Sequence, residues 1–169
     1  MSDSWSIVAF RVTVTLWLVT VSVWDHLHRR VPNWIVLPVM AGALGYRIYG
    51  AFVGQADALL FTAVSWVAVF LLWRAHIFGG GDSKFLMSLF ALFPSLRFLV
   101  FFSVGYLLLS IPLLVAKYVR KKPRELLTSV RARTQSGQLL PDAEELAREG
   151  RPYCWTMAIP SLVYLWLAA

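Results

Sequence analysis

The chain has 169 residues, of which 59% are hydrophobic, and its mean hydropathy is +0.65. Because ordinary soluble domains contain only about 45–50% apolar residues, this composition argues against a water-soluble fold and indicates a protein of the lipid bilayer. The net charge of +7 does not predict nucleic-acid binding in such a chain, since clustered Lys and Arg fix the topology of membrane proteins.

Six apolar runs along the chain each predict a membrane helix. The first covers residues 5–24 and ends in the polar turn DHLHRRVPN, where Pro32 blocks helix continuation and Asn33 is expected to cap the next helix. The following runs cover residues 34–53, 58–77, 83–93, 98–119 and 153–169. The fourth run is short, and the last also has fewer than the ~20 residues that usually cross a bilayer.

The positive charges predict how these helices are oriented. If the turn after the first run is cytoplasmic, thirteen of the sixteen Lys and Arg residues lie inside, and only Arg11, Arg47 and Arg97 lie toward the other side. The positive-inside rule then places the amino terminus outside. We therefore predict an all-α, polytopic membrane helical bundle of about six transmembrane helices.

The length allows one domain, so residues 1–169 are expected to form a single membrane-embedded unit. Residues 120–151 are predicted to form a cytoplasmic loop. Within it, PDAEELAREG predicts a short helix. Asp142 is expected to cap it, Glu145 to complete a capping box, and Gly150 to end it.

Two of the nine acidic residues fall at the membrane boundary in this topology. Asp25 lies at the inner end of the first run and Asp82 at the inner start of the fourth. Carboxylates at such depth are costly and usually face the bundle interior or a water-filled cavity. Two that converge share one proton, so the ionised member can take a proton from water while the protonated member polarises a peptide carbonyl. This mechanism needs no metal and no cofactor.

Three glycines precede the second carboxylate. Gly79, Gly80 and Gly81 are expected to allow close backbone approach and positive φ, so that an extended substrate strand can lie beside them. They also place Asp82 at the amino end of a helix, where the dipole favours negative charge. Lys84 either contributes a topological charge or tunes Asp82, and the sequence leaves both possibilities open.

Each carboxylate has a simpler interpretation when it is considered alone. Asp25 could be an interface residue paired with Arg29 or Arg30. Asp82 could be a helix cap after a flexible turn. The presence of a second carboxylate at matching depth favours the catalytic interpretation of both.

Other reactive side chains do not form a recognisable site. The three histidines, His26, His28 and His76, lack the spacing of a metal cluster. Cys154 is the single cysteine, so it permits neither an internal disulfide nor a multi-cysteine zinc site, and it is expected to be a small apolar residue.

The two polar motifs together resemble those of the type IV prepilin peptidases, a family of polytopic aspartic peptidases. The first motif is matched by Asp25, Arg30, Val31, Pro32 and Asn33, and the second by Gly79, Gly81, Asp82 and Lys84. The segment RPYCWTMAIP is similar to the proline-containing segment that opens the family's last helix, although Cys154 and Trp155 stand where smaller residues are usual.

The resemblance implies that Asp25 and Asp82 form a catalytic dyad, supported by Arg30, Pro32, Asn33, Gly79, Gly80, Gly81 and Lys84. The substrate would be a prepilin or pseudopilin precursor in the lipid bilayer. It would be cut at the cytoplasmic face of the bacterial inner membrane, between a short basic leader and a hydrophobic helix. The chain resembles the short, peptidase-only branch, because it lacks the paired-cysteine loop of members that also methylate the new terminus.

Three alternatives accompany this interpretation. A non-enzymatic pilus-assembly scaffold would not need two carboxylates at this depth, and a small proton-coupled transporter would need them across the membrane thickness. A presenilin-like peptidase shares the Gly-x-Gly-Asp motif but normally has its first Asp within a helix that lacks the Pro-Asn turn. The basic inner surface is a difficulty for the favoured function, since it would repel a basic leader.

Overall fold

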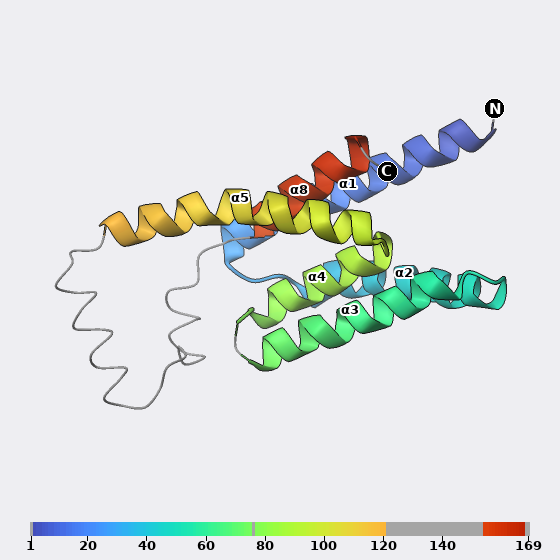
Figure 1. Ribbon diagram of the computed structural model, residues 1–169. Coiled ribbons are helices and arrows are strands. Elements are labelled where there is room, and N and C mark those ends of the chain that lie inside the picture. Colours follow the sequence, from blue (N-terminus) through green and yellow to red (C-terminus); the bar gives the residue numbers. More distant parts are fainter. Residues whose placement is uncertain (1, 76, 121–153, 168–169) are drawn as a thin grey trace.

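The computed structural model describes residues 2–75, 77–120 and 154–167. These residues form six helices and no strand (Figure 1), so the predicted all-α fold is confirmed. The helices are α1 (Ser2–His28), α2 (Asn33–Phe52), α3 (Ala56–Arg74), α4 (Gly80–Leu92), α5 (Leu96–Arg120) and α8 (Cys154–Leu167). The short helix predicted within PDAEELAREG lies outside the described residues.

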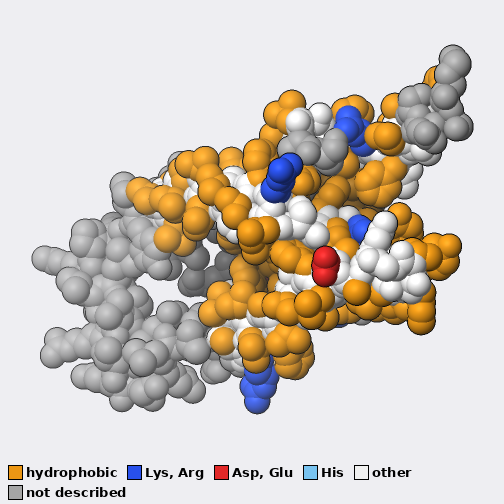
Figure 2. Space-filling view, turned by 45° about the vertical axis from the view of Figure 1, so that its right-hand side comes forward, with side chains coloured by type: hydrophobic (Ala, Val, Ile, Leu, Met, Phe, Trp, Pro, Cys, Tyr) orange, Lys and Arg blue, Asp and Glu red, His pale blue; other side chains and the backbone are white. Residues whose placement is uncertain are grey.

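Four of the six helices, α1, α2, α3 and α5, are long and apolar enough to cross a membrane. Their outer faces are largely apolar, and Figure 2 shows one such face with few charged side chains. The helices α4 and α8 contain 13 and 14 residues. At a rise of 1.5 Å per residue, each is about 20 Å long and shorter than a hydrocarbon core of ~30 Å. Within the described residues, the fourth and sixth apolar runs therefore form helices shorter than a full-length span.

Helix α1 continues four residues beyond the apolar run that predicts it. Residues 25–28 contain no Pro or Gly, so nothing in the sequence stops the helix before His28. The chain leaves the helix at Arg29, which has a φ of 54°. Asp25 therefore lies in the last turn of α1, and its backbone carbonyl accepts a hydrogen bond of 2.7 Å from the Arg29 N–H.

The expected cap at Asn33 is wrong. Asn33 is the first residue of α2, and Pro32 occupies the cap position with φ −75° and ψ 133° and gives no side-chain cap bond. The Asn33 Oδ1 instead accepts a hydrogen bond of 2.8 Å from Lys84 Nζ, at the start of α4. The polar side chain at this turn thus links two helices rather than ending one.

The helices pack as two groups that meet at α4. Helix α8 lies against α1 and α5, whereas α4 lies against α2 and α3 and also contacts α8. The carboxyl end of α1 and the amino ends of α2, α4 and α8 lie toward the same end of the bundle, at the left of Figure 1. A Cβ on Gly105 of α5 would lie only 2.7 Å from the Cβ of Pro160, so the glycine permits the close contact of α5 with α8.

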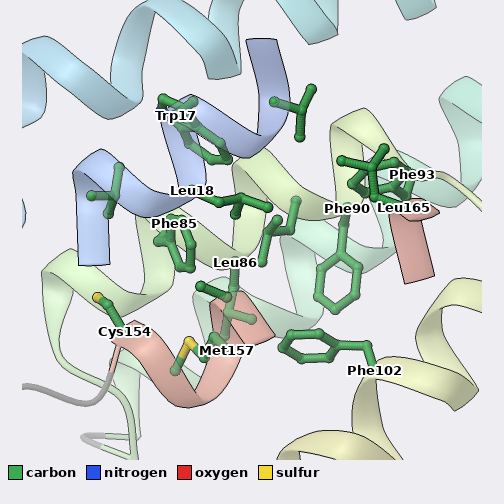
Figure 3. Close-up of a cluster of buried hydrophobic side chains, with 14 of the residues drawn as sticks. Trp17, Leu18, Phe85, Leu86, Phe90, Phe93, Phe102, Cys154, Met157 and Leu165 are labelled. Carbon is green, nitrogen blue, oxygen red and sulfur yellow. The ribbon is translucent and has the colours of Figure 1, made fainter. Parts of the chain in front are cut away.

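Aromatic and aliphatic side chains, mainly of α1, α4, α5 and α8, form the core (Figure 3), to which α2 and α3 add Val36 and Val69. Trp17 of α1 packs on the ring of Phe85 with 5.3 Å between centroids. Its indole N–H donates to the backbone carbonyl of Ile35 at 3.1 Å, so this buried polar atom is paired. Seven of the 13 residues of α4 are buried, which shows that other helices enclose it.

Candidate active site

Asp25 continues the buried face of α1. Val14, Leu18, Val21 and Asp25 follow one another at helical spacings of four, three and four residues, and all four are buried. The exposed fraction of Asp25 is 6%. The same periodicity that directs three apolar side chains into the core therefore directs this carboxylate toward the bundle interior.

Asp82 lies in the first turn of α4, as the sequence predicts. Gly79 holds the cap position, and the Asp82 carboxylate bends back over it and accepts a hydrogen bond from its backbone N–H. A Cβ on Gly79 would lie 3.1 Å from Asp82 Oδ2. Gly79 thus leaves room for the carboxylate that it helps to hold.

The expectation of positive φ at the three glycines is wrong. Gly79 has a φ of −65°, and Gly80 and Gly81 are helical. Among the glycines in the described ranges, only Gly54 has positive φ. These glycines serve close approach instead, because a Cβ on Gly81 would lie 3.0 Å from the Cβ of Val31.

The two sequence motifs contact each other at Gly81 and Val31 and through one hydrogen bond. Gly81 packs on Val31, and Lys84 donates to Asn33, so the start of α4 lies directly on the turn between α1 and α2. Pro32 is half-buried in that turn, whereas Arg30 is exposed. The Lys84–Asn33 contact joins the two motifs. It does not test whether Lys84 contributes a topological charge or tunes Asp82.

Both carboxylates contact one further residue, Cys154, at the start of α8. The backbone N–H of Cys154 donates to Asp25 Oδ2 at 3.2 Å, and its thiol donates to Asp82 Oδ1 at 3.5 Å. The cysteine is fully buried, at the edge of the core cluster in Figure 3. Three helices, α1, α4 and α8, therefore bring Asp25 and Asp82 to the same place.

The surroundings of Asp82 favour its protonated form. Burial, with a smaller contribution from the charge of Asp25, raises the pKa of this carboxyl to about 6, although hydrogen bonds from the Cys154 thiol and the Gly79 backbone oppose the shift. Asp82 belongs to α4, which is not one of the four long spans. A carboxyl whose pKa is raised to about 6, beside a second carboxylate, can act as a general acid.

An aromatic cluster lies next to Asp25. Trp24 stacks on His28 with 4.4 Å between centroids and meets Trp34 edge-on at 5.5 Å. Trp side chains are enriched where a bilayer meets water, so this cluster favours a position of the dyad near that boundary. In the part of the chain that is described, no group of three potential metal ligands is found.

The contact with Cys154 was missed by sequence reasoning. The residue opens an apolar segment, and a single thiol more than 70 residues from either aspartate carries no local signal of contact with them. The only available sign was that Cys154 departs from the smaller residue expected at this point of the segment.

Comparison with known families gives a match over most of the described helices. The model of the type IV leader peptidase family matches residues 12–115, more than half of the chain, and the match includes Asp25, Asp82 and both motifs. A search of curated proteins and of solved structures found no match. On the strength of the family match, the chain belongs to the type IV leader peptidase family.

Proposed function

We propose that this membrane protein is an aspartic endopeptidase that removes the leader peptide of type IV prepilin-like or pseudopilin precursors. Asp25 and Asp82 are the catalytic pair, and the reaction takes place at the cytoplasmic face of the bacterial inner membrane. The observation that carries the proposal is the convergence of both carboxylates on Cys154. The family match supports the substrate class.

The proposed chemistry uses one water molecule and one shared proton. The ionised carboxylate accepts a proton from water, and the resulting hydroxide forms a bond to the carbonyl carbon of the scissile peptide. The protonated carboxyl donates to the carbonyl oxygen and stabilises the charge that develops there. The C–N bond then breaks as the amine takes up a proton, which leaves a carboxylate on the leader and a new amino terminus on the pilin.

The surroundings of the two carboxyls suit an unequal division of these roles. Asp25 accepts a hydrogen bond from the backbone N–H at the amino end of α8, where helix N–H groups favour a negative charge. Burial raises the pKa of Asp82 to about 6, which suits the role of the protonated member. We assign Asp25 as the base and Asp82 as the acid in the first step.

The test is cleavage of a co-expressed prepilin-type precursor in membranes. Asp25→Asn and Asp82→Asn should each abolish the shorter product while the protein still inserts, because the pair loses its base or its acid. Asp57→Asn is the matched control, since Asp57 is exposed in the first turn of α3 at the other end of the bundle (Figure 1). Retained cleavage by either dyad variant would refute the assignment.

The same experiment separates the alternatives. A pilus-assembly scaffold should support assembly equally well with either Asn variant and should yield no shorter product from the wild type. A proton-coupled transporter should lose transport in these variants without any effect on a precursor. The peptidase proposal requires loss of the shorter product specifically.

A further inference from the structure

We propose that Cys154 is a positioning residue that sets the relative placement of the two catalytic aspartates from the start of α8. This inference rests on the proposed function, and it adds a third residue to the pair. Cys154 lies outside residues 12–115, which match the family model, so the match does not assign it a role. The structure assigns the role through two contacts made by one residue.

The two contacts are of different kinds and reach different helices. The backbone N–H of Cys154 fixes Asp25 Oδ2 of α1, and the thiol fixes Asp82 Oδ1 of α4. The Asp82 carboxylate also accepts from the Gly79 N–H, so Cys154 and Gly79 together orient it. Because the N–H and the thiol belong to one residue, both carboxylates must stay within hydrogen-bonding reach of Cys154, which limits how far apart they can lie.

The position of Cys154 is itself well determined. It is fully buried and belongs to the core cluster together with Phe85 and Met157. The helix that it opens packs along α1 and α5, and the close contact of Gly105 with Pro160 limits how that helix can move. The position of α8 therefore determines where Cys154 holds the two carboxylates.

The thiol also affects the balance between the charged and neutral forms of Asp82. The groups that act on this carboxyl are the Asp25 carboxylate, the Cys154 thiol and the Gly79 backbone N–H, in addition to burial. Lys84 in the same turn of α4 directs its amino group to Asn33. A thiol that donates to the carboxylate favours the charged form, so its removal raises the pKa of Asp82.

The first measurement needs no substrate, because the chain has a single cysteine and its S–H stretching band in the infrared reports on Cys154 alone. We expect this band in the wild-type protein to move to higher frequency as the pH is lowered and Asp82 becomes protonated, because a neutral acceptor binds the thiol proton more weakly. In Asp82→Asn the band should lie at the higher frequency at every pH. A band that is unaffected by pH and by Asp82→Asn would overturn the proposed contact.

The second measurement is the pH dependence of precursor cleavage by Cys154→Ala and Cys154→Ser. The Ala variant should lower kcat and move the basic limb of the profile upward by on the order of one pH unit, whereas Ser restores a donor and should move the limb back. Met157→Leu, a volume-conserving change in the next turn of the core, is the control and should leave the profile in place.

The outcomes separate this inference from the proposed function. If Cys154→Ala lowers activity without moving the pH profile, or if Ser fails to restore it, the residue has only a packing role and the inference is wrong while the peptidase stands. If Asp25→Asn and Asp82→Asn retain cleavage, the proposed function itself fails.

Discussion

At the level of single residues, Asp25 and Asp82 lie in different surroundings despite their common contact. Asp25 is the more buried of the two and receives a backbone N–H from the start of a helix. Asp82 receives a thiol and the N–H of Gly79 but has a raised pKa, because burial outweighs these bonds. The ionised form of Asp82 therefore lowers the stability of the folded protein. Such perturbed groups cluster at functional sites.

Because ionised Asp82 lowers the folding stability, we predict that Asp82→Asn does not destabilise the protein at pH 8. An acid with a raised pKa in the folded state costs stability above that pKa and costs nothing below its ordinary value, near 3.8. Thermal unfolding in detergent should thus show the variant about 2–3 kcal/mol more stable than the wild type at pH 8, and equal to it below about pH 3. Asp57→Asn should show no such change with pH. A stability loss at pH 8 would contradict the assigned cost.

A second prediction concerns the contact of Gly81 with Val31. Gly81→Ala places a methyl group 3.0 Å from the Val31 Cβ and should displace the turn that carries the first motif. We expect a loss of about 1–3 kcal/mol in stability together with lower cleavage activity. Gly45→Ala is the control, because no atom lies within 4 Å of its added Cβ.

The double variant Gly81→Ala/Val31→Ala decides whether this contact is the cause. Removing the Val31 side chain makes room for the added methyl group, so activity should return toward that of Val31→Ala alone. If the activity losses of the two single variants instead add in the double variant, the loss in Gly81→Ala has another origin.

At the level of elements, α4 is the helix on which the candidate site depends. Its amino end is held by the Lys84–Asn33 bond, and its middle by the Trp66 indole, which donates to the Met87 carbonyl at 2.8 Å. Its carboxyl end is held by Arg47 of α2, which donates to the carbonyls of Ala91 and Leu92 at 2.9 and 2.7 Å. A helix too short to cross the bilayer thus has its polar ends satisfied by neighbouring helices.

The bonds from Arg47 give a third prediction. Arg47→Met leaves two carbonyls at the end of α4 without these donors, and it should lower the free energy of unfolding by about 2–4 kcal/mol. Arg47→Lys should recover only part of this loss, since an ammonium group does not reproduce the planar fork. Arg97→Met, at an exposed position, should have a much smaller effect. Equal losses in Arg47→Met and Arg97→Met would remove the proposed role of the two bonds.

At the level of the whole molecule, the candidate site lies at one end of the bundle and Arg11, Arg47 and Arg97 lie toward the other. Arg11 lies 5.8 Å from the ring centroid of Trp166 near the end of the described chain. The turn with Arg29 and Arg30 lies at the end that holds Asp25 and Asp82. The orientation expected from the positive charges, with the amino terminus outside and Asp25 and Asp82 toward the cytoplasm, stays a prediction.

Labelling with a membrane-impermeant maleimide tests this orientation. In a Cys154→Ser background, which contains no other cysteine, Gln55→Cys between α2 and α3 should react in intact spheroplasts. Arg29→Cys, in the turn after α1, should react only after the membrane is opened. The reverse pattern would place the dyad outside and exclude cleavage at the cytoplasmic face.

The sequence by itself determined the helices and the identity of the two aspartates. Apolar runs set the helix positions because the bilayer requires each segment to satisfy its own backbone. Helix α1 exceeds its apolar run by three residues at the amino end and four at the carboxyl end. Asp25 and Asp82 stood out because carboxylates are rare at the membrane boundary. Neither feature depends on how the helices pack.

Tertiary structure decided the contacts between segments that are distant in the sequence. The bonds from Cys154 to Asp25 and Asp82 span 129 and 72 residues, and the Lys84–Asn33 bond spans 51. Local pattern does not encode such contacts, since they depend on how close α4 and α8 approach their neighbours. For the same reason, Asn33 was expected to cap its own helix, and only the packing of α4 against the turn showed a different partner for it.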